Sequence, residues 1–297
     1  MLLERIQIVT VCTPALAATA EAYTQFLNYA VVERGQVPTE LAAVWDAPRM
    51  AGRDFLLLQP ASKADVYLRL ISNAAIDGFA AMKTFGWNSN EILTQDPDAM
   101  AKRLESSPFR VIGPPANLST SKEIRAMQAV GLAEEVIYLT RLPDSGEVSA
   151  LGTAETPVDR TFIVVVGGPD MEAMRAFYRD VLGLPVSEPV GARIRVLSKA
   201  HGMSMETSHP LATARLPRQF LIEIDQYPEA ATERPHRQGE LPPGMAMVAF
   251  TTPNLDALSD RLIASPAAIA AAPYAGRVTG VIRGAAGELI ELLQQSP

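Results

Sequence analysis

The sequence predicts an α+β protein of two domains, in which a unit of one strand, one helix and about three further strands occurs four times. Three observations predict this class. The 297 residues are about twice the length of a typical domain. Apolar residues make up 48% and charged residues 20% of the chain, as in globular proteins. Most tellingly, long stretches of the sequence recur in its second half.

The longest recurrence lies near the start of each half. Residues 8–29 and 163–184 align without a gap at an offset of 155 residues. Each segment begins with a β-branched apolar run that predicts a buried strand, and continues with Pro14 or Pro169 at the start of a helical pattern. A strand followed by a helix is therefore predicted twice. The recurrence also argues against a signal peptide at the N-terminus, because the same pattern occurs inside the chain.

Two further pairs of segments recur. Residues 98–108 and 256–266 share six of eleven residues at an offset of 158, and both predict a helix that ends at a Ser-Pro step. Residues 131–139 and 284–292 align at an offset of 153 and predict a turn followed by a last strand. Alternating apolar and polar residues predict additional strands at 54–60, 65–72, 192–198 and 219–225.

The four units group into two predicted domains, 1–147 and 158–297. The stretch 143–158 between them is polar and contains Gly and Pro, as expected of a linker. We expect each domain to contain two of the units.

Composition argues against several classes of function. The net charge is −7 and no basic stretch offsets it, so nucleic acid and anionic membranes are poor partners. No apolar run reaches the length of a membrane span. Cys12 is the only cysteine, has no histidine nearby in sequence and is interpreted as structural; a reducing, cytoplasmic location and a bacterial source fit this composition. Neither a phosphate-binding loop nor a serine-hydrolase elbow is present.

The repeated unit, with FYRDVLGL at 177–184 and GELIEL at 287–292, resembles the vicinal oxygen chelate superfamily. That group includes glyoxalase I, extradiol dioxygenases, epimerases and bleomycin-resistance proteins. The resemblance covers nearly the whole chain. It implies four βαβββ modules that form two glyoxalase-like domains, each with a curved mixed sheet around a cup that usually holds a divalent metal.

The resemblance also implies that metal ligands come from the first and last strands of each module. The corresponding residues are Ile8, Ser89, Ile163 and Met247 in first strands, and Arg69, Tyr138, Glu223 and Glu291 in last strands. A metal-dependent member needs His, Gln or Glu at all four positions of one cup. Because Ile163 and Met247 are apolar, the sequence predicts a degenerate site without a metal cofactor, and it argues against an extradiol dioxygenase, which needs two His and a carboxylate.

Glu223 and Glu291 are the candidate catalytic residues. Two carboxyl groups that face each other in one apolar cup, walled by Ile163 and Met247, would repel, so one should keep a proton near neutral pH. An acid and base pair of this kind suits proton abstraction next to a carbonyl, or an elimination, on a small and partly hydrophobic molecule. The alternative is that both glutamates face solvent or bond to backbone.

Other residues are candidates for substrate binding. Arg69 and Tyr138, with Ser89 nearby, would line the other cup and could anchor a carboxylate or phenolate, unless Arg69 points outward and Tyr138 packs in the core. Trp45 and Trp87 could stack on an aromatic ligand or serve as core residues.

His201, His209 and His236 lie in segments rich in Gly, Pro or Ser, so solvated loop positions are expected, although a metal site that includes His201 or His236 stays open. Two functions remain: a lyase or isomerase on a small organic substrate, and a protein that only binds or sequesters a small molecule, of the bleomycin-resistance type. The scaffold alone does not decide between them. A monomer or a homodimer is expected.

Overall fold

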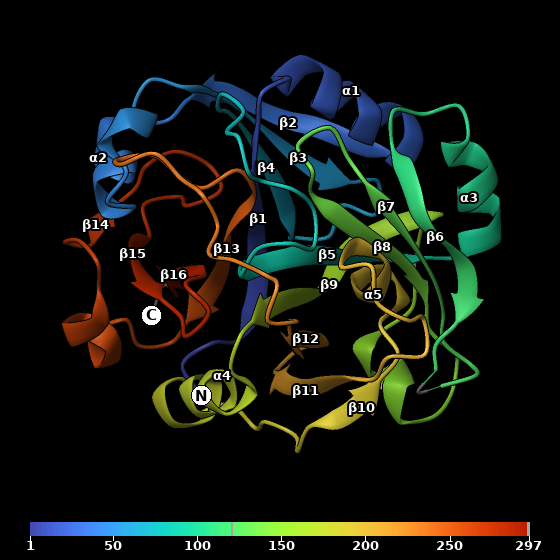
Figure 1. Ribbon diagram of the computed structural model, residues 1–297. Helices are drawn as coiled ribbons and strands as arrows, with labels where there is room; N and C mark the ends of the chain where they lie inside the picture. The colour runs from blue at the N-terminus through green and yellow to red at the C-terminus, as the bar shows by residue number, and fades with distance from the viewer. Residues whose placement is uncertain (120, 296–297) are drawn as a thin grey trace.

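The computed structural model describes residues 1–119 and 121–295, which form two curved, mixed sheets of eight strands each (Figure 1). We number the repeated units modules 1 to 4 in chain order; they begin with β1, β5, β9 and β13. One sheet, here the 1–4 sheet, has the order β14 (Ala267–Ala268), β15 (Val278–Arg283), β16 (Leu289–Gln294), β13 (Gly244–Thr252), β1 (Arg5–Thr13), β4 (Tyr67–Ser72), β3 (Asp54–Pro60) and β2 (Tyr29–Gln36). The other, the 2–3 sheet, has the order β10 (Val190–Ala192), β11 (His209–Leu216), β12 (Phe220–Gln226), β9 (Val158–Gly168), β5 (Gly86–Thr94), β8 (Val136–Arg141), β7 (Arg125–Val130) and β6 (Arg110–Asn117).

Each sheet combines modules from different halves of the chain. β1 pairs antiparallel with β13, with Thr10 opposite Met247, and β5 pairs antiparallel with β9, with Glu91 opposite Ile163. The expectation that modules of one half share a sheet is therefore wrong. The segment between β8 and β9, which contains the 3₁₀ helix η2 (Glu147–Leu151), is long enough to carry β9 past β8 to the free edge of β5. The edges of β1 and β13 are then left to pair with each other.

A helical segment follows the first strand of every module and packs on the face opposite the cup. These segments are α1 (Leu16–Leu27), α3 (Pro97–Leu104), α4 (Met171–Ala176) continued by the π-helical turn η3 (Phe177–Val181), and the 3₁₀ helix η4 (Asp256–Arg261). Tyr23, Met100, Met174 and Leu258 of these segments share one apolar cluster with the backs of both sheets. The segment 256–266, predicted as a helix, forms only the short 3₁₀ helix η4. The side chain of Asp96 caps the N-terminus of α3.

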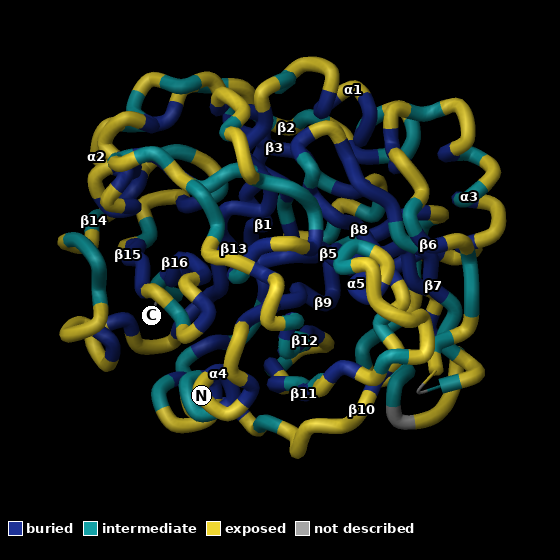
Figure 2. The backbone as a smooth tube through the Cα atoms, in the orientation of Figure 1, coloured by how far each residue is buried: buried dark blue, intermediate teal, exposed yellow. Residues whose placement is uncertain are grey.

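The concave faces are covered by shorter segments. α2 (Thr39–Val44) and η1 (Pro48–Met50) cover the 1–4 cup, where Cys12 is buried among apolar side chains. α5 (Arg195–Ala200) covers the 2–3 cup, and part of the strand predicted at 192–198 belongs to this helix because Val196 and Leu197 pack into the cup. Figure 2 shows that buried residues lie mainly on the strands and exposed residues mainly on the connections between them.

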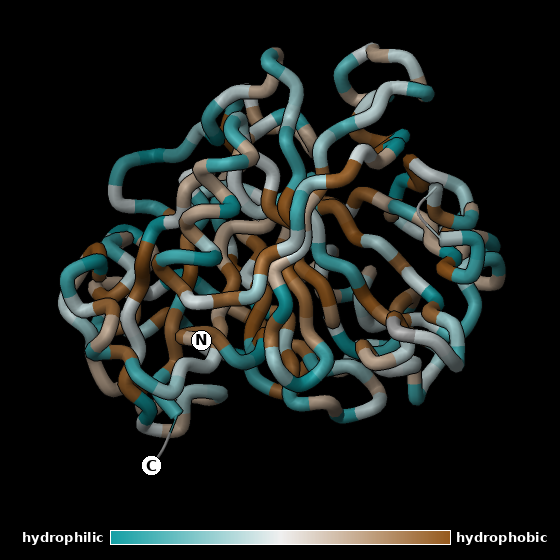
Figure 3. Tube along the Cα trace, turned by 90° about the horizontal axis from the view of Figure 1, so that it is seen from below, coloured by the Kyte–Doolittle hydropathy of each residue, from teal (hydrophilic) through white to brown (hydrophobic). Residues whose placement is uncertain are grey.

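Apolar residues concentrate on the central strands when the molecule is seen from below (Figure 3). Within 1–119 and 121–295, none of the helices combines the length and hydropathy that a transmembrane helix requires.

Candidate functional site

An ion pair occupies the middle of the 1–4 cup. Arg69 lies on β4 beside Thr10 of β1, and Glu291 lies on β16 beside Ala249 of β13. Arg69 Nη2 is 2.9 Å from Glu291 Oε2, and the two side chains are 3% and 0% exposed. The pair thus joins module 1 to module 4 through a fully desolvated contact.

Three further side chains complete this cluster. The Tyr274 hydroxyl and the Trp45 indole N–H donate to Glu291 Oε1 at 2.7 and 2.8 Å. Arg69 donates from Nε and Nη2 to Thr10 Oγ1, and its guanidinium lies 4.6 Å from the centre of the Trp45 ring. Burial disfavours the charged guanidinium, but Tyr274 and Glu291 outweigh burial and raise the pKa of Arg69. The Glu291 carboxylate is therefore matched in both charge and hydrogen bonds.

The 2–3 cup instead contains three carboxyl groups. Glu223 and Asp225 lie two residues apart on β12 and so share a face, and Glu91 lies on β5. Asp225 is fully buried, Glu91 is nearly so, and Glu223 is half-buried. Burial raises the pKa of Glu91 to about 7 and, with the charge of Glu91, raises the pKa of Asp225 to about 8. Burial, Asp225 and Glu91 together raise the pKa of Glu223 well above its ordinary value.

These carboxyl groups have few hydrogen-bond partners. Thr140 donates to Glu91. Among the residues that the structure describes, both carboxyl oxygens of Asp225, the Ser89 hydroxyl and the Tyr227 hydroxyl are buried without a partner. Most buried polar groups in proteins are hydrogen-bonded, so four unpaired oxygens in one region call for a functional explanation.

The structure separates the two carboxyl groups that were expected in one cup. Glu223 belongs to the 2–3 sheet and Glu291 to the 1–4 sheet, because module 3 pairs with module 2 and module 4 with module 1. Arg69, expected with Tyr138, is instead the partner of Glu291. Tyr138 lies near Glu223 and Glu91, which with burial raise the pKa of its phenol.

The remaining predicted positions divide in the same way. Ser89 and Ile163 belong to the 2–3 sheet, and Ile8 and Met247 belong to the apolar cluster of the 1–4 cup. Ile163 and Met247 were expected to wall a single cup, so that expectation is also wrong. Both pack against apolar neighbours of their own sheet.

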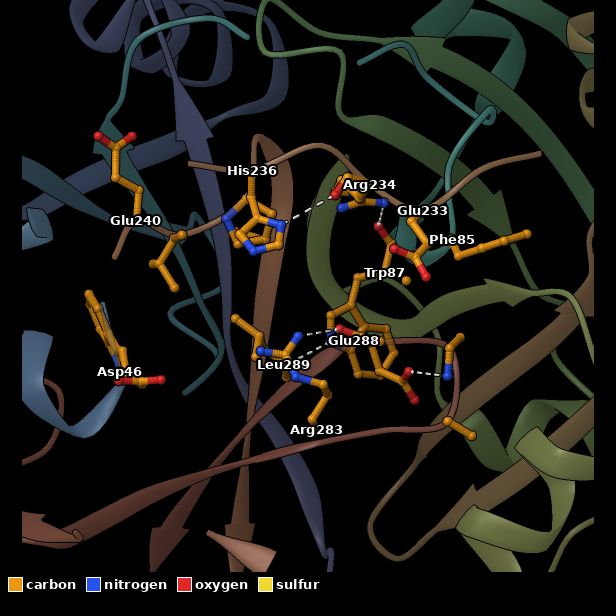
Figure 4. A pocket seen from close by; sticks show the side chains of 18 of the residues that line it. Asp46, Phe85, Trp87, Glu233, Arg234, His236, Glu240, Arg283, Glu288 and Leu289 are labelled. Carbon is orange, nitrogen blue, oxygen red and sulfur yellow. Dashed lines mark hydrogen bonds between the residues drawn. The ribbon is translucent and has the colours of Figure 1, made fainter. Parts of the chain in front are cut away.

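A cavity of about 660 Å³ opens where the two sheets meet, and both tryptophans line it, although each is buried in an apolar cluster. The Trp87 indole N–H donates to the carbonyl of Leu289 at 2.7 Å, so its ring, like that of Trp45, is held in place. Figure 4 shows the charged side chains around this space. They are Asp46, Glu233, Arg234, His236, Glu240, Arg283 and Glu288.

Arg234 connects this cavity to the 2–3 cup. It lines the cavity and donates to the carbonyls of Met245 and Trp87 at 2.6 and 2.5 Å and to the Thr84 hydroxyl at 3.1 Å. Burial lowers the pKa of Arg234 to about 10. Its charge acts on Tyr227 inside the cup, where it opposes the rise in pKa that burial and Asp225 cause.

Neither cup offers the donor set of a metal-dependent family member. In the 1–4 cup, the Arg69 guanidinium lies directly against Glu291 and would repel a cation. In the 2–3 cup, the donors on the strands are carboxyl groups, and the His201 imidazole, which packs edge-on against the Tyr227 ring, has its Nε2 at 2.9 Å from the Met82 carbonyl. Within the described part of the chain, no three His, Cys, Asp or Glu side chains gather closely enough to hold a metal ion. The residues therefore do not fit the family metal.

The histidines differ from expectation in part. His236 is exposed and lines the cavity. His209, expected in a solvated loop, is buried on β11 with its Nε2 at 2.8 Å from the Ser198 hydroxyl, and burial lowers its pKa. His201 is half-buried, with its Nε2 at 2.9 Å from the Met82 carbonyl.

Sequence reasoning missed Glu91, Asp225 and Tyr274. A signal existed for the first two, because each follows a predicted position, Ser89 or Glu223, by two residues and so shares its face of the strand. Tyr274 lies in an irregular segment between β14 and β15, where no periodic pattern indicates a side-chain direction.

Comparison with known proteins agrees with this architecture. Residues 161–292, which span modules 3 and 4, match the model of the Glyoxalase/Bleomycin resistance protein/Dioxygenase superfamily. The match covers less than half of the chain, so it shows a likeness of modules 3 and 4 to that superfamily.

Solved structures share the fold over the full length. Glyoxalase I from Zea mays superimposes with a TM-score of 0.66 at 14% identity, covering 98% of this chain and 92% of that one. A dioxygenase candidate from Bacillus subtilis superimposes with a TM-score of 0.61 at 11% identity, covering 99% and 86%. At these identities the likeness shows the fold alone. No curated protein sequence matches the chain.

Proposed function

We propose that the protein is a lyase or isomerase that acts on a small, partly hydrophobic organic molecule by acid–base catalysis in the 2–3 cup, without a metal. One observation carries this proposal: two buried carboxyl groups and one half-buried carboxyl group share the cup, and the pKa values of Glu91 and Asp225 are raised to about 7 and about 8. Such groups divide between protonated and ionised forms at neutral pH, which is what general acid–base catalysis requires.

The roles follow from accessibility. Glu223 is the half-buried member of the cluster and is the proposed base, which takes a proton from the carbon next to a substrate carbonyl. Burial and nearby acidic groups raise the pKa of Tyr138, so its phenol keeps its proton and can donate a hydrogen bond to the enolate oxygen.

Asp225 is the proposed acid. In an isomerisation, a proton from the cluster returns to the same carbon on its opposite face, and the enolate electron pair forms the new C–H bond, so the configuration of that carbon is inverted. In an elimination, that electron pair forms a C=C bond, and the leaving oxygen departs with its bonding pair and takes the proton of Asp225. Both routes balance without an oxidant or a metal. One chain supplies all four modules, so neither cup needs a second chain to be complete.

Proton exchange in D₂O tests this proposal. Small ketones, aldehydes and 2-oxo acids are incubated with the protein, and loss of the proton next to the carbonyl is followed by ¹H NMR. We expect exchange of at least one compound, slowed about 100-fold or more by Glu223→Gln. Glu135→Gln is the matched control, because Glu135 is also buried with its pKa raised to about 7 but bonds to Tyr23 and the Ala133 backbone outside the cup. Exchange that survives Glu223→Gln would overturn the proposal.

A second candidate function is binding without chemistry, and the cavity between the sheets favours it. Its volume of about 660 Å³ lies within the range of small-molecule sites, and two fixed tryptophans line it. A ligand in this space should quench the tryptophan fluorescence. Trp87→Phe should then weaken binding while Glu223→Gln leaves it unchanged, and the compounds that bind should show no proton exchange in D₂O.

A further inference from the structure

The carboxyl groups of the 2–3 cup have no counter-charge in contact with them in the described part of the chain, and the charge of Arg234 acts on Tyr227. The charged groups that act on Glu223 and Asp225 are other carboxyl groups, and each raises the pKa further. Within residues 1–119 and 121–295, no ion pair is formed by Glu91, Glu223 or Asp225. By contrast, Glu291 in the other cup has Arg69. A cation from outside the chain would therefore meet no competing positive charge on these three carboxyl groups.

Unpartnered hydroxyl groups near the carboxyl cluster provide a second and separate observation. Ser89 and Tyr227 are 0% and 3% exposed, and neither hydroxyl has a hydrogen-bond partner in the described chain. Ser89 shares a strand face with Glu91, and the Tyr227 phenol lies near enough to Asp225 and Glu223 for their charges to act on it. Together with the two free oxygens of Asp225, these groups can accept several N–H donors at once.

An organic ammonium ion fits this arrangement better than a metal ion does. A metal needs its oxygen ligands to converge to about 2.0–2.6 Å, and the carboxyl groups here do not gather in that way. An ammonium group has three donors and no acceptor, and its hydrogen bonds reach about 2.7–3.2 Å. The phenols of Tyr138 and Tyr227 lie close enough to the carboxyl groups for their charges to act on them, and each can accept a further hydrogen bond.

We infer that the 2–3 cup binds a small primary amine in its ammonium form, with the nitrogen held by Asp225 and Glu223 and an apolar group packed against Ile163 and Val165. These two apolar residues lie on β9, between β12 and β5, and Val165 is the register partner of both Glu223 and Ser89. The inference rests on the proposed function only in placing the active site in this cup. It names the substrate class as amines that carry a short apolar substituent.

Isothermal titration calorimetry near neutral pH tests the inference with butylammonium and benzylammonium, each compared with its neutral alcohol isostere. We expect at least one ammonium ion to bind about tenfold or more tightly than its alcohol. Asp225→Asn should weaken that binding about tenfold or more, since it removes a charge-assisted partner. Ser89→Ala, which removes a single hydroxyl, should weaken it a few-fold and guards against misfolding of the first variant.

Glu135→Gln again serves as the matched control and should bind the ammonium ions as the wild type does. The inference is overturned if the alcohols bind equally well, if neither ammonium ion binds below about 10 mM, or if both cup variants keep full affinity. Stoichiometric binding of Mn²⁺ that displaces the ammonium ion would show a metal site instead. Ammonium binding without proton exchange in D₂O would overturn catalysis and keep this inference, whereas exchange of neutral substrates alone would do the opposite.

Discussion

Glu291 in the 1–4 cup and Glu223 in the 2–3 cup stand at corresponding positions on the last strand of a module, but their surroundings differ. Glu291 is paired with a guanidinium and accepts hydrogen bonds from a phenol and an indole. In the part of the chain that the structure describes, the charged groups that act on Glu223 are Asp225 and Glu91, which carry its own sign. The same fold thus contains one carboxylate with a counter-charge, Glu291, and one carboxyl group beside other acidic groups, Glu223. Buried acidic groups without a counter-charge have raised pKa values, and such groups are candidates for a functional site because ionising them lowers stability.

The largest effect on stability is expected in the 1–4 cup, where Arg69 is the counter-charge of Glu291. Arg69→Met should destabilise the protein by about 3–5 kcal/mol, because it leaves the Glu291 carboxylate buried without its counter-charge. The double variant Arg69→Met/Glu291→Leu should recover most of this loss, since it removes both charges. Urea unfolding followed by circular dichroism measures both. A single variant as stable as the wild type would show that the two cups do not differ in the way described.

The buried carboxyl groups of the 2–3 cup should make the free energy of unfolding depend on pH. Burial raises the pKa of Glu91 from 4.5 to about 7 and that of Asp225 from 3.8 to about 8. Between these values the folded chain holds protons that the unfolded chain has released, so stability should fall as pH rises from about 4 to about 8. Each group contributes a slope of up to about 1.4 kcal/mol per pH unit. Glu135 and Glu288, with pKa values raised to about 7, act in the same direction.

The Asp225→Asn variant distinguishes the contribution of the 2–3 cup to this pH dependence from the contributions of Glu135 and Glu288. The variant should flatten part of the slope and exceed the wild type in stability at pH 8, as thermal unfolding across a pH series would show. A wild-type stability that is constant or rising over this range would contradict the proposed protonation of the cup.

The smallest effect concerns one hydrogen bond in the 1–4 cup. Trp45→Phe removes the indole donor to Glu291 Oε1 and should cost about 1 kcal/mol, because Tyr274 and Arg69 still bind the carboxylate. Tyr274→Phe removes the other donor to the same oxygen and also an acceptor for Arg69, so it should cost about 1–2 kcal/mol. Urea midpoints unchanged in both variants would show that the Arg69 contact alone holds Glu291.

Much of the fold could be predicted from the sequence because the repeat is local. Residues 131–139 and 284–292 do form corresponding turns, in which Glu135 and Glu288 each accept a backbone N–H two residues earlier and a tyrosine hydroxyl. The partner of each module could not be predicted in this way. The offsets are the same whichever modules pair, and the choice depends on strand edges that are distant in sequence.

The site was predictable only one residue at a time. Of the four last-strand positions, Arg69 and Glu291 contact each other, and Tyr138 and Glu223 lie close to each other in the other sheet. Which of these residues contact each other depends on how the modules pair. Glu223 and Glu291, which were expected together, therefore lie in different sheets, and Arg69 is the partner of Glu291. The cavity between the sheets is built from the start of β5, the turn between β15 and β16, and the segment before β13, and no single stretch of sequence shows this combination.

The pairing of the first module with the last has a consequence for how the chain is made. During synthesis the 2–3 sheet has all its strands once Gln226 has left the ribosome, whereas β1 has no partner for one edge until β13 follows. That open edge is a place where another strand could add. A nascent or truncated chain that lacks its last module would therefore expose β1 beside a finished neighbouring sheet, and exchange of the missing strand with a second chain would be its characteristic misfolding route.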